Sequence, residues 1–183
     1  MTRSKDVRVA LIQPALPAYR IPVFEALSKR PGVDLTVFYG DVRDLANGAG
    51  GTFKRELVDE WWFAGDRLLF SPVQIKAALS GSFDVVVFPW SSRSLTLVPG
   101  LLFARMRGLG TVVWGHGFSK QDSPVRRWVR NRIARLATSV LFYAKPAAQR
   151  FAQETGLSES VFVAPNTIDT TPIDEAITAW CSR

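Results

Sequence analysis

The sequence predicts an α/β protein built on a doubly wound, mostly parallel sheet. About six or seven short β-branched or apolar runs alternate with segments of helical periodicity along the 183 residues. That alternation is typical of β-α-β units joined by right-handed crossovers. An apolar content of 47% is ordinary for a single globular domain with a packed core.

The first β-α-β unit opens the chain. Residues 7–13 form an apolar run that predicts a strand, and residues 34–39 predict a second one. Pro22 suits the first turn of a helix that we expect to extend to about Lys29. The segment 14–20 holds two prolines, which favours a loop over a continued strand.

The next part of the chain has a mixed character. We expect a loop over 40–51, a strand over 52–58 and the aromatic segment 61–63 under a loop. A helix over 72–80 follows, with Ser71 as its N-cap. After it we expect a buried strand over 83–88 and a helix over 94–107.

The stretch 111–120 is the centre of the functional argument. Residues 111–114 predict a buried strand, and Gly115 and Gly117 flank His116, the only histidine in the chain. His116 is therefore expected at the carboxyl edge of a parallel sheet, where ligands bind. A histidine that only hydrogen-bonds within its loop is an equally good interpretation of the position alone.

After this stretch the pattern of helices and strands continues. We expect a helix over 124–138 with Ser123 as N-cap, a strand over 139–143, a helix over 146–155 ended by Gly156, a strand over 161–164 and a last helical piece over 174–180.

The net charge of +7 is concentrated in the second half. Residues 105–150 hold ten Lys/Arg and one acid, whereas the remainder holds thirteen cations and fifteen acids. This basic field suits phosphates, an anionic membrane surface or nucleic acid. No nucleic-acid-binding module is found, so we expect no nucleic-acid partner.

The helix over 124–138 carries much of this charge and admits two interpretations. It is either a solvated amphipathic helix that covers the sheet, or a docking face for anionic lipid. In the second case Arg126, Arg127 and Arg130 face the membrane, and Trp128 is the interfacial anchor.

Several function classes are excluded by what the sequence lacks. It has no G-x-G-x-x-G after the first strand, no P-loop, no H-E-x-x-H and no G-x-S-x-G. The single cysteine, Cys181, excludes an internal disulfide and a cysteine-based metal cluster. We expect neither a metal nor a cofactor. No apolar run is long enough for a signal-peptide core or a membrane span, so we expect a cytoplasmic protein. A peripheral location on the inner membrane face is compatible with this expectation.

Three stretches follow one another in a characteristic order. The first is Arg8-Val9-Ala10-Leu11-Ile12-Gln13-Pro14 with the later Tyr19-Arg20-Ile21-Pro22-Val23-Phe24-Glu25-Ala26-Leu27. The second is Phe83-Asp84-Val85-Val86-Val87, then Leu101 to Gly110, then Val112-Val113-Trp114-Gly115-His116-Gly117. The third is Val161-Phe162-Val163-Ala164-Pro165-Asn166-Thr167-Ile168-Asp169. Together they resemble the N-terminal domain of group 1 (family 4) glycosyltransferases. Thr111 stands where that family commonly has proline, and Thr167 where it commonly has glycine.

The resemblance implies the GT-B fold, in which two Rossmann-like domains face each other across a cleft. Residues 1–169 would be the acceptor-side N-terminal domain, and 170–183 the start of the interdomain segment. The second domain, absent here, would be supplied in cis or in trans. The implied co-substrate is a nucleotide-sugar, without a metal, and the implied acceptor is a glycan or a lipid-linked molecule.

The resemblance also implies roles for individual residues. His116 would be the catalytic residue that hydrogen-bonds the donor sugar, and Arg20 would meet the charge of the leaving diphosphate. Further substrate-binding residues would be Tyr19, Trp90, Arg93, Gly115, Gly117 and Lys120. Two alternatives are a stand-alone binding subunit of a split glycosyltransferase and an unrelated Rossmann-like nucleotide-binding regulator, which the missing phosphate fingerprint disfavours.

Overall fold

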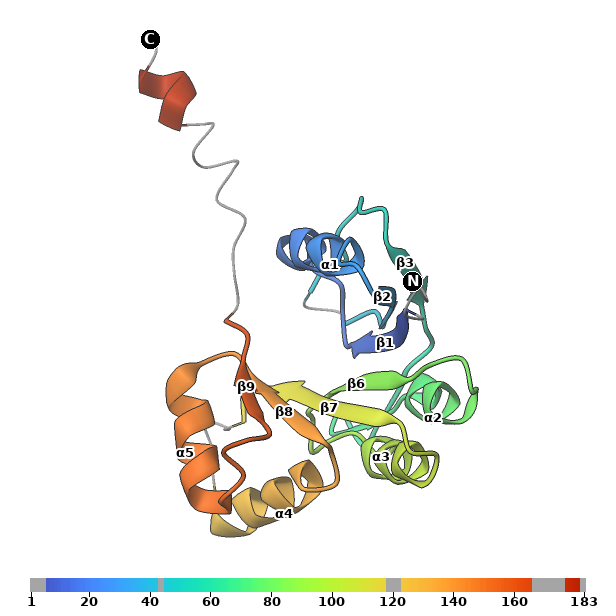
Figure 1. Ribbon diagram of the computed structural model, residues 1–183, viewed down its shortest axis with the longest axis vertical. Coiled ribbons are helices and arrows are strands. Elements are labelled where there is room, and N and C mark those ends of the chain that lie inside the picture. Colours follow the sequence, from blue (N-terminus) through green and yellow to red (C-terminus); the bar gives the residue numbers. More distant parts are fainter. Residues whose placement is uncertain (1–5, 43–44, 118–122, 166–176, 182–183) are drawn as a thin grey trace, which may run out of the picture.

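The computed structural model describes residues 6–42, 45–117, 123–165 and 177–181. Within them the chain forms a seven-stranded sheet of order β3-β2-β1-β6-β7-β8-β9, with every neighbouring pair parallel (Figure 1). Helices pack on both faces. The predicted α/β class with a doubly wound parallel sheet is therefore confirmed.

The strands lie close to where the hydrophobic pattern predicts them. Their bounds are β1 Val7–Gln13, β2 Val33–Tyr39, β3 Lys54–Leu57, β4 Trp61–Phe63, β5 Leu68–Phe70, β6 Val85–Pro89, β7 Gly110–Gly115, β8 Ser139–Phe142 and β9 Val161–Val163.

The helices begin where proline is compatible with a first turn. Pro22, Pro72, Pro124 and Pro146 all occupy that turn, where the missing N–H removes no helical hydrogen bond. The helices are α1 Ile21–Ser28, α2 Pro72–Leu79, α3 Leu97–Met106, α4 Pro124–Ala134 and α5 Lys145–Thr155, with a short 3₁₀ turn, η1, over Ala18–Arg20.

The order of the strands reverses direction at β1. The crossover through α1 places β2 and then β3 on one side of β1, and β6 to β9 follow on the other side. Such a switch point separates the loops that leave the two neighbouring strands and opens a crevice at their carboxyl ends. The ends of β1 and β6 are therefore the place to look for a ligand site.

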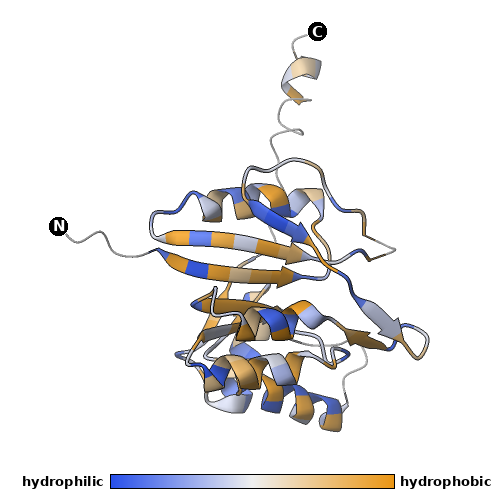
Figure 2. Cartoon of the chain, turned by 90° about the vertical axis from the view of Figure 1, so that its right-hand side faces the viewer, coloured by the Kyte–Doolittle hydropathy of each residue, from blue (hydrophilic) through white to orange (hydrophobic). Residues whose placement is uncertain are grey.

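The two faces of the sheet are covered unequally. One face packs against α2, α3, α4 and α5 through buried residues such as Phe88, Leu101 and Phe151. On the other face, α1 is the only described helix of the buried cluster that contains Leu11, Val37 and Trp114 (Figure 1). At the edge of the sheet, β3 is hydrophilic and exposed (Figure 2), which discourages pairing with another chain.

Some sequence predictions differ from the structure. The aromatic segment 61–63 does not lie under a loop. It forms β4 of an antiparallel hairpin with β5, and Trp61 and Phe63 are 49% and 51% exposed. The hairpin forms because a tight turn joins the two strands, and Ala64, Gly65 and Asp66 in that turn all have positive φ.

Two helices are shorter than predicted because their ends bond to strands. The helix expected from residue 94 begins at Leu97, since Leu95 donates its backbone N–H to Leu69 of β5 at 2.8 Å. Helix α4 ends at Ala134 rather than Thr138, whose hydroxyl donates to the carbonyl of Thr111 in β7 at 2.6 Å.

The predicted N-caps behave differently from each other. Ser123 caps α4, because its hydroxyl accepts the N–H of Arg126 at 3.3 Å. Ser71 occupies the N-cap position of α2 but makes no capping bond with its side chain.

Part of the predicted features falls outside the described residues. This is true of Lys120, of Asn166 to Asp169 and of residues 170–176, whereas residues 177–181 are helical as expected. The division into a domain over 1–169 and a following segment stays a prediction.

Candidate active site

A cavity of about 490 Å³ opens at the carboxyl edge of the sheet. Its walls come from the ends of β1, β6 and β7, from the start of the loop after β8 and from helix α4. This is the position that the switch point at β1 specifies.

The cavity brings together most of the residues that the sequence singled out. Arg130, which the sequence assigned to a membrane face, also lines this cavity. The predicted residues that line it are Tyr19, Arg20, Trp90, Arg93, Gly115, His116 and Gly117.

Arg20 is held in the cavity by hydrogen bonds and aromatic rings. Its guanidinium donates to the side-chain carbonyl of Gln13 and to the hydroxyl of Tyr143, the latter at 2.7 Å. It also lies over the rings of Trp114 and Tyr143, 5.0 and 5.3 Å from their centroids. A guanidinium fixed in this way loses little further entropy when it binds an anion.

Gln13 and Tyr143 are functional residues that the sequence analysis missed. Gln13 is the last residue of β1 and is 2% exposed, and Tyr143 follows directly after β8. Both stand at the carboxyl end of a strand, a position that could have identified them. Burial raises the pKa of the Tyr143 hydroxyl, although the charge and hydrogen bond of Arg20 oppose the shift.

His116 is exposed to the cavity. Its imidazole stacks obliquely on Tyr143, with ring centroids 4.5 Å apart, and no described residue forms a hydrogen bond with it. The interpretation of His116 as a histidine satisfied within its loop therefore has no support from the described residues. Neither ring nitrogen has a hydrogen-bond partner within residues 6–42, 45–117, 123–165 and 177–181.

The two glycines beside His116 are required by packing. A Cβ on Gly115 would lie 2.9 Å from the Cβ of Trp90, and one on Gly117 would overlap the ring of Phe142. Gly117 also has φ +73°, which disfavours other residues. Both residues line the cavity, but the need for glycine comes from the neighbouring aromatic rings.

Trp90 and Arg93 belong to the loop after β6, which is anchored at both ends. The indole of Trp90 packs edge-on against Phe142 and Phe151, at 5.5 and 5.6 Å between centroids. The carbonyl of Arg93 accepts the N–H of Leu69 in β5 at 2.9 Å, so the exposed hairpin braces this side of the cavity.

The charge of the cavity is one-sided. Arg20, Arg93 and Arg130 line it together with His116, and its described lining includes no Asp or Glu. Cations that line a concave site attract anionic groups such as phosphates or carboxylates. In the described part of the chain, no group of three His, Cys, Asp or Glu side chains could hold a metal ion.

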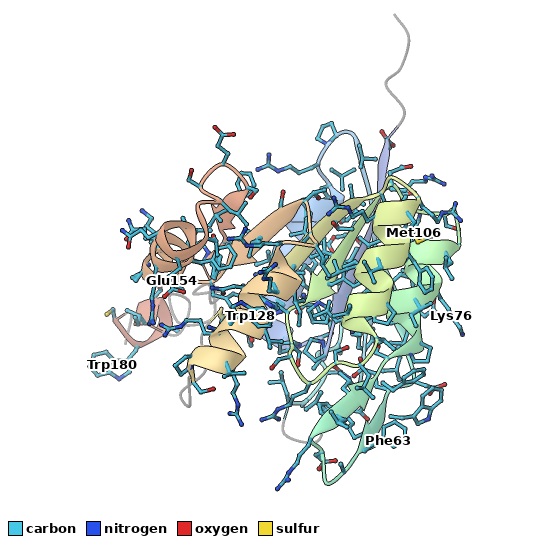
Figure 3. The ribbon with its side chains drawn as sticks, turned by 90° about the horizontal axis from the view of Figure 1, so that it is seen from below. Phe63, Lys76, Met106, Trp128, Glu154 and Trp180 are labelled. Atoms are coloured by element: carbon cyan, nitrogen blue, oxygen red, sulfur yellow. The ribbon has the colours of Figure 1, made fainter. Side chains whose placement is uncertain are left out.

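The four predicted membrane-facing residues all belong to α4 but differ in their contacts. Arg130 lines the cavity, and Arg127 forms an ion pair with Glu154 of α5 at 3.4 Å. Arg126 is exposed. Trp128 is 59% exposed (Figure 3), and the guanidinium carbon of Arg132 lies 5.1 Å from the centroid of its ring. None of the described helices is both long and apolar enough to cross a bilayer.

Comparisons with known proteins give matches among solved structures alone. No protein-family model matches the chain, and no curated protein matches it. The structure is similar to a UDP-N-acetylglucosamine 2-epimerase, with TM-score 0.55 and 16% identity over 88% of this chain and 47% of that one.

Two further solved structures are similar to this chain. Staphylococcus aureus MnaA, solved with UDP, gives TM-score 0.55 and 17% identity over 87% of this chain and 44% of its own. The UDP-N-acetylglucosamine 2-epimerase of Rickettsia bellii gives TM-score 0.52 and 12% identity over 97% of this chain and 48% of its own. At these identities the likeness defines the class of fold, an α/β Rossmann-like domain. The chain spans about half the length of each of these structures.

Proposed function

We propose that this chain is the acceptor-side domain of a GT-B glycosyltransferase, which transfers a sugar from a nucleotide-sugar to a glycan or lipid-linked acceptor. The observation that carries the proposal is the cavity that a fixed Arg20 and His116, which has no hydrogen bond with a described residue, line together. It agrees with the family resemblance, and it lies where open α/β sheets bind their ligands.

The proposed roles follow from the charges of the two side chains. Arg20 stabilises negative charge on the diphosphate as the bond to the sugar breaks, because its guanidinium is already oriented toward the cavity. His116 hydrogen-bonds a hydroxyl of the sugar and holds the reacting carbon in place. A second domain, in cis or in trans, would bind the nucleotide, and this chain alone is expected to be inactive.

The test uses the coding DNA downstream of codon 183 and the protein that it specifies. If a second α/β domain follows, the two-domain protein is assayed for transfer of labelled sugar from a panel of UDP- and GDP-sugars. A His116→Ala change should lower kcat by about 10²-fold or more. An unchanged kcat would remove this role for His116.

A split enzyme is the alternative if no second domain follows. The chain would then bind a separate donor-binding subunit. Size-exclusion chromatography of the chain with the product of a neighbouring gene would show a complex, and transfer activity would require both proteins. Two separate peaks and no activity in the mixture would contradict this form of the proposal.

A second candidate function is favoured by the likeness to UDP-N-acetylglucosamine 2-epimerases. A 2-epimerase inverts one carbon of the sugar, and this chain would then form the corresponding half of such an enzyme. The two candidates differ in their products. A transferase releases free nucleotide only when an acceptor is present, whereas an epimerase converts one UDP-sugar into another without an acceptor.

A further inference from the structure

A second cavity lies on the sheet face that α1 covers. It has a volume of about 240 Å³ and is almost entirely apolar. Helix α1 contributes Val23 and Leu27 to its walls, and the sheet contributes Val87, Val112 and Leu141. We call this cavity the α1 groove.

The α1 groove exists because helices cover this face incompletely. Side chains alternate along each strand, so Val113 and Val140 face the side that α2 to α5 cover, whereas Val112 and Leu141 face the other side. There α1 is the only described helix of the cluster, and among the strands it packs most extensively against β2. Partly exposed aliphatic side chains of β7 and β8 therefore form the floor of the groove.

The α1 groove and the active-site cavity meet at shared residues. Tyr19, Arg20 and Trp114 line both of them. Arg20 is thus a cation between a basic cavity and an apolar one. The hydrogen bonds to Gln13 and Tyr143 fix it there, and its Nε has no acceptor among the described residues.

The apolar surface continues along α1 beyond the groove. A more open hollow shares Val23 and Leu27 with the groove and adds Pro22, Ala26 and Arg30. Val23 is 40% exposed, so the wall of the groove is accessible from solvent. The apolar path therefore starts at Arg20 and follows the helix outward.

We propose that the α1 groove binds the hydrocarbon chain of a lipid phosphate whose phosphate group lies at Arg20. Because Arg20 lines both spaces, the same guanidinium contacts the lipid phosphate from the groove and the donor diphosphate from the active-site cavity. The anionic head of such a lipid needs a fixed cation, which Arg20 supplies. Its hydrocarbon chain needs an adjacent apolar channel, which the groove supplies. The inference rests on the proposed function. It selects a lipid-linked acceptor over a free polysaccharide, because a polysaccharide has no group that the groove would bind.

The experiment measures equilibrium binding to this chain, without donor or transfer. The probes are farnesyl phosphate and dodecyl phosphate, both below the concentration at which they form micelles, and inorganic phosphate. Both lipid phosphates should bind at least tenfold more tightly than inorganic phosphate, since each buried methylene contributes about fourfold. Tighter binding of one of the two identifies an isoprenoid or an unbranched chain.

Three variants separate the parts of the site. Val23→Glu puts a charge at the partly exposed wall of the groove and should weaken lipid binding at least tenfold, while binding of inorganic phosphate is unchanged. Arg20→Gln should weaken binding of all three probes. Met106→Glu is the matched control, since Met106 is 80% exposed on α3 and lines neither cavity, and it should change nothing.

Clear results would overturn the proposal. Equal affinity for lipid phosphates and inorganic phosphate would do so, as would lipid binding that Val23→Glu leaves intact. If lipid binds only after removal of residues 177–183, then Ile177 and Trp180 of this chain fill the groove, and the proposal is wrong.

Failure of this proposal is distinguishable from failure of the proposed function. Lipid binding without any sugar transfer in the two-domain protein would support the groove and contradict the transferase. Transfer to a polysaccharide without lipid binding would support the transferase and contradict the groove.

Discussion

Arg20 and Tyr143, 123 positions apart in the sequence, are joined by a hydrogen bond of 2.7 Å from guanidinium to phenol. The bond ties the turn after β1 to the residue after β8, and it fixes the cation that separates the active-site cavity from the α1 groove. The imidazole of His116 stacks on the ring of the same tyrosine. Tyr143 therefore positions both residues that we propose act on the substrate.

Removal of the Tyr143 hydroxyl should loosen Arg20. We expect Tyr143→Phe to lower the free energy of unfolding by about 1 kcal/mol, since one hydrogen bond to a charged group is lost. Binding of inorganic phosphate or UDP should weaken by about three- to tenfold, as measured by calorimetry. Tyr39→Phe is the control, because Tyr39 ends β2 and does not line the active-site cavity. Equal ligand affinity in the Tyr143 variant would show that Arg20 holds its position without the bond.

Gly117 should be far less tolerant of substitution than another glycine with the same backbone conformation. Gly117 and Gly156 both have φ +73°, but a Cβ on Gly156 would meet nothing within 4 Å, whereas one on Gly117 would overlap Phe142. We expect Gly156→Ala to lower the free energy of unfolding by about 1 kcal/mol, from backbone strain alone. Gly117→Ala should cost about 3 kcal/mol or more, because the buried ring must move.

Urea denaturation of the two glycine variants measures the difference. The comparison removes the common cost of positive φ and leaves the cost of displacing Phe142. Similar losses for both variants would mean that the Phe142 ring moves aside freely, and packing would then not explain the glycine at 117.

Helix α4 carries an exposed apolar patch that an anionic membrane could bind. Val125 and Trp128 are 71% and 59% exposed, and Arg126 is exposed between them. We expect the chain to co-sediment with vesicles that contain anionic lipid, more weakly as salt increases, and Arg126→Ala with Trp128→Ala to reduce this binding several-fold. Met106→Ala, on an exposed apolar residue of α3, is the control. Co-sedimentation that the double variant leaves unchanged would exclude this patch as the membrane contact.

The choice of these two residues depends on the structure. From the sequence, Arg127 and Arg130 belong to the same basic face as Arg126. Arg127 pairs with Glu154, and Arg130 lines the active-site cavity, so their replacement would disturb packing and the site as well. Helical periodicity identifies an amphipathic helix, but it does not specify which charged side chains its tertiary partners take up.

The fold was predictable because its signals are local. Short apolar runs, prolines in first helical turns and stop signals such as Gly156 each act within a few residues, and they placed most elements correctly. The predictions were wrong where a distant contact decides. The helix expected from residue 94 starts at Leu97 because residues 94 and 95 pair with β5, and the aromatic residues 61–63 are exposed because they pair with β5 as well.

The candidate site was predictable in part for a similar reason. The position of His116 after a strand, and the family resemblance, led to residues that do line one cavity. Gln13 and Tyr143 were missed because their role depends on a contact with Arg20 that spans the sheet. One residue of the resemblance has a structural role instead: Asp84 forms a 2.7 Å ion pair with Arg8 near the amino ends of β6 and β1.

Glu60 should give stability an unusual dependence on pH. It precedes β4, and burial raises the pKa of its carboxyl. A carboxyl whose pKa is raised in the folded state favours folding most when it is protonated. The stabilisation is fully present below the unfolded pKa, about 4.3, and is lost as pH rises through the raised folded pKa.

Replacement of Glu60 by glutamine removes the ionisation but keeps the shape. We therefore expect Glu60→Gln to raise Tm relative to the unaltered protein at pH 7 to 8, and the difference to shrink toward zero near pH 4. The control is Glu56→Gln, because Glu56 lies exposed on the edge strand β3 and should leave the pH profile of Tm unchanged. A Glu60→Gln protein that is less stable at pH 8 would mean that the ionised carboxylate itself makes a favourable contact in the fold, and that the carboxyl is charged in the native state.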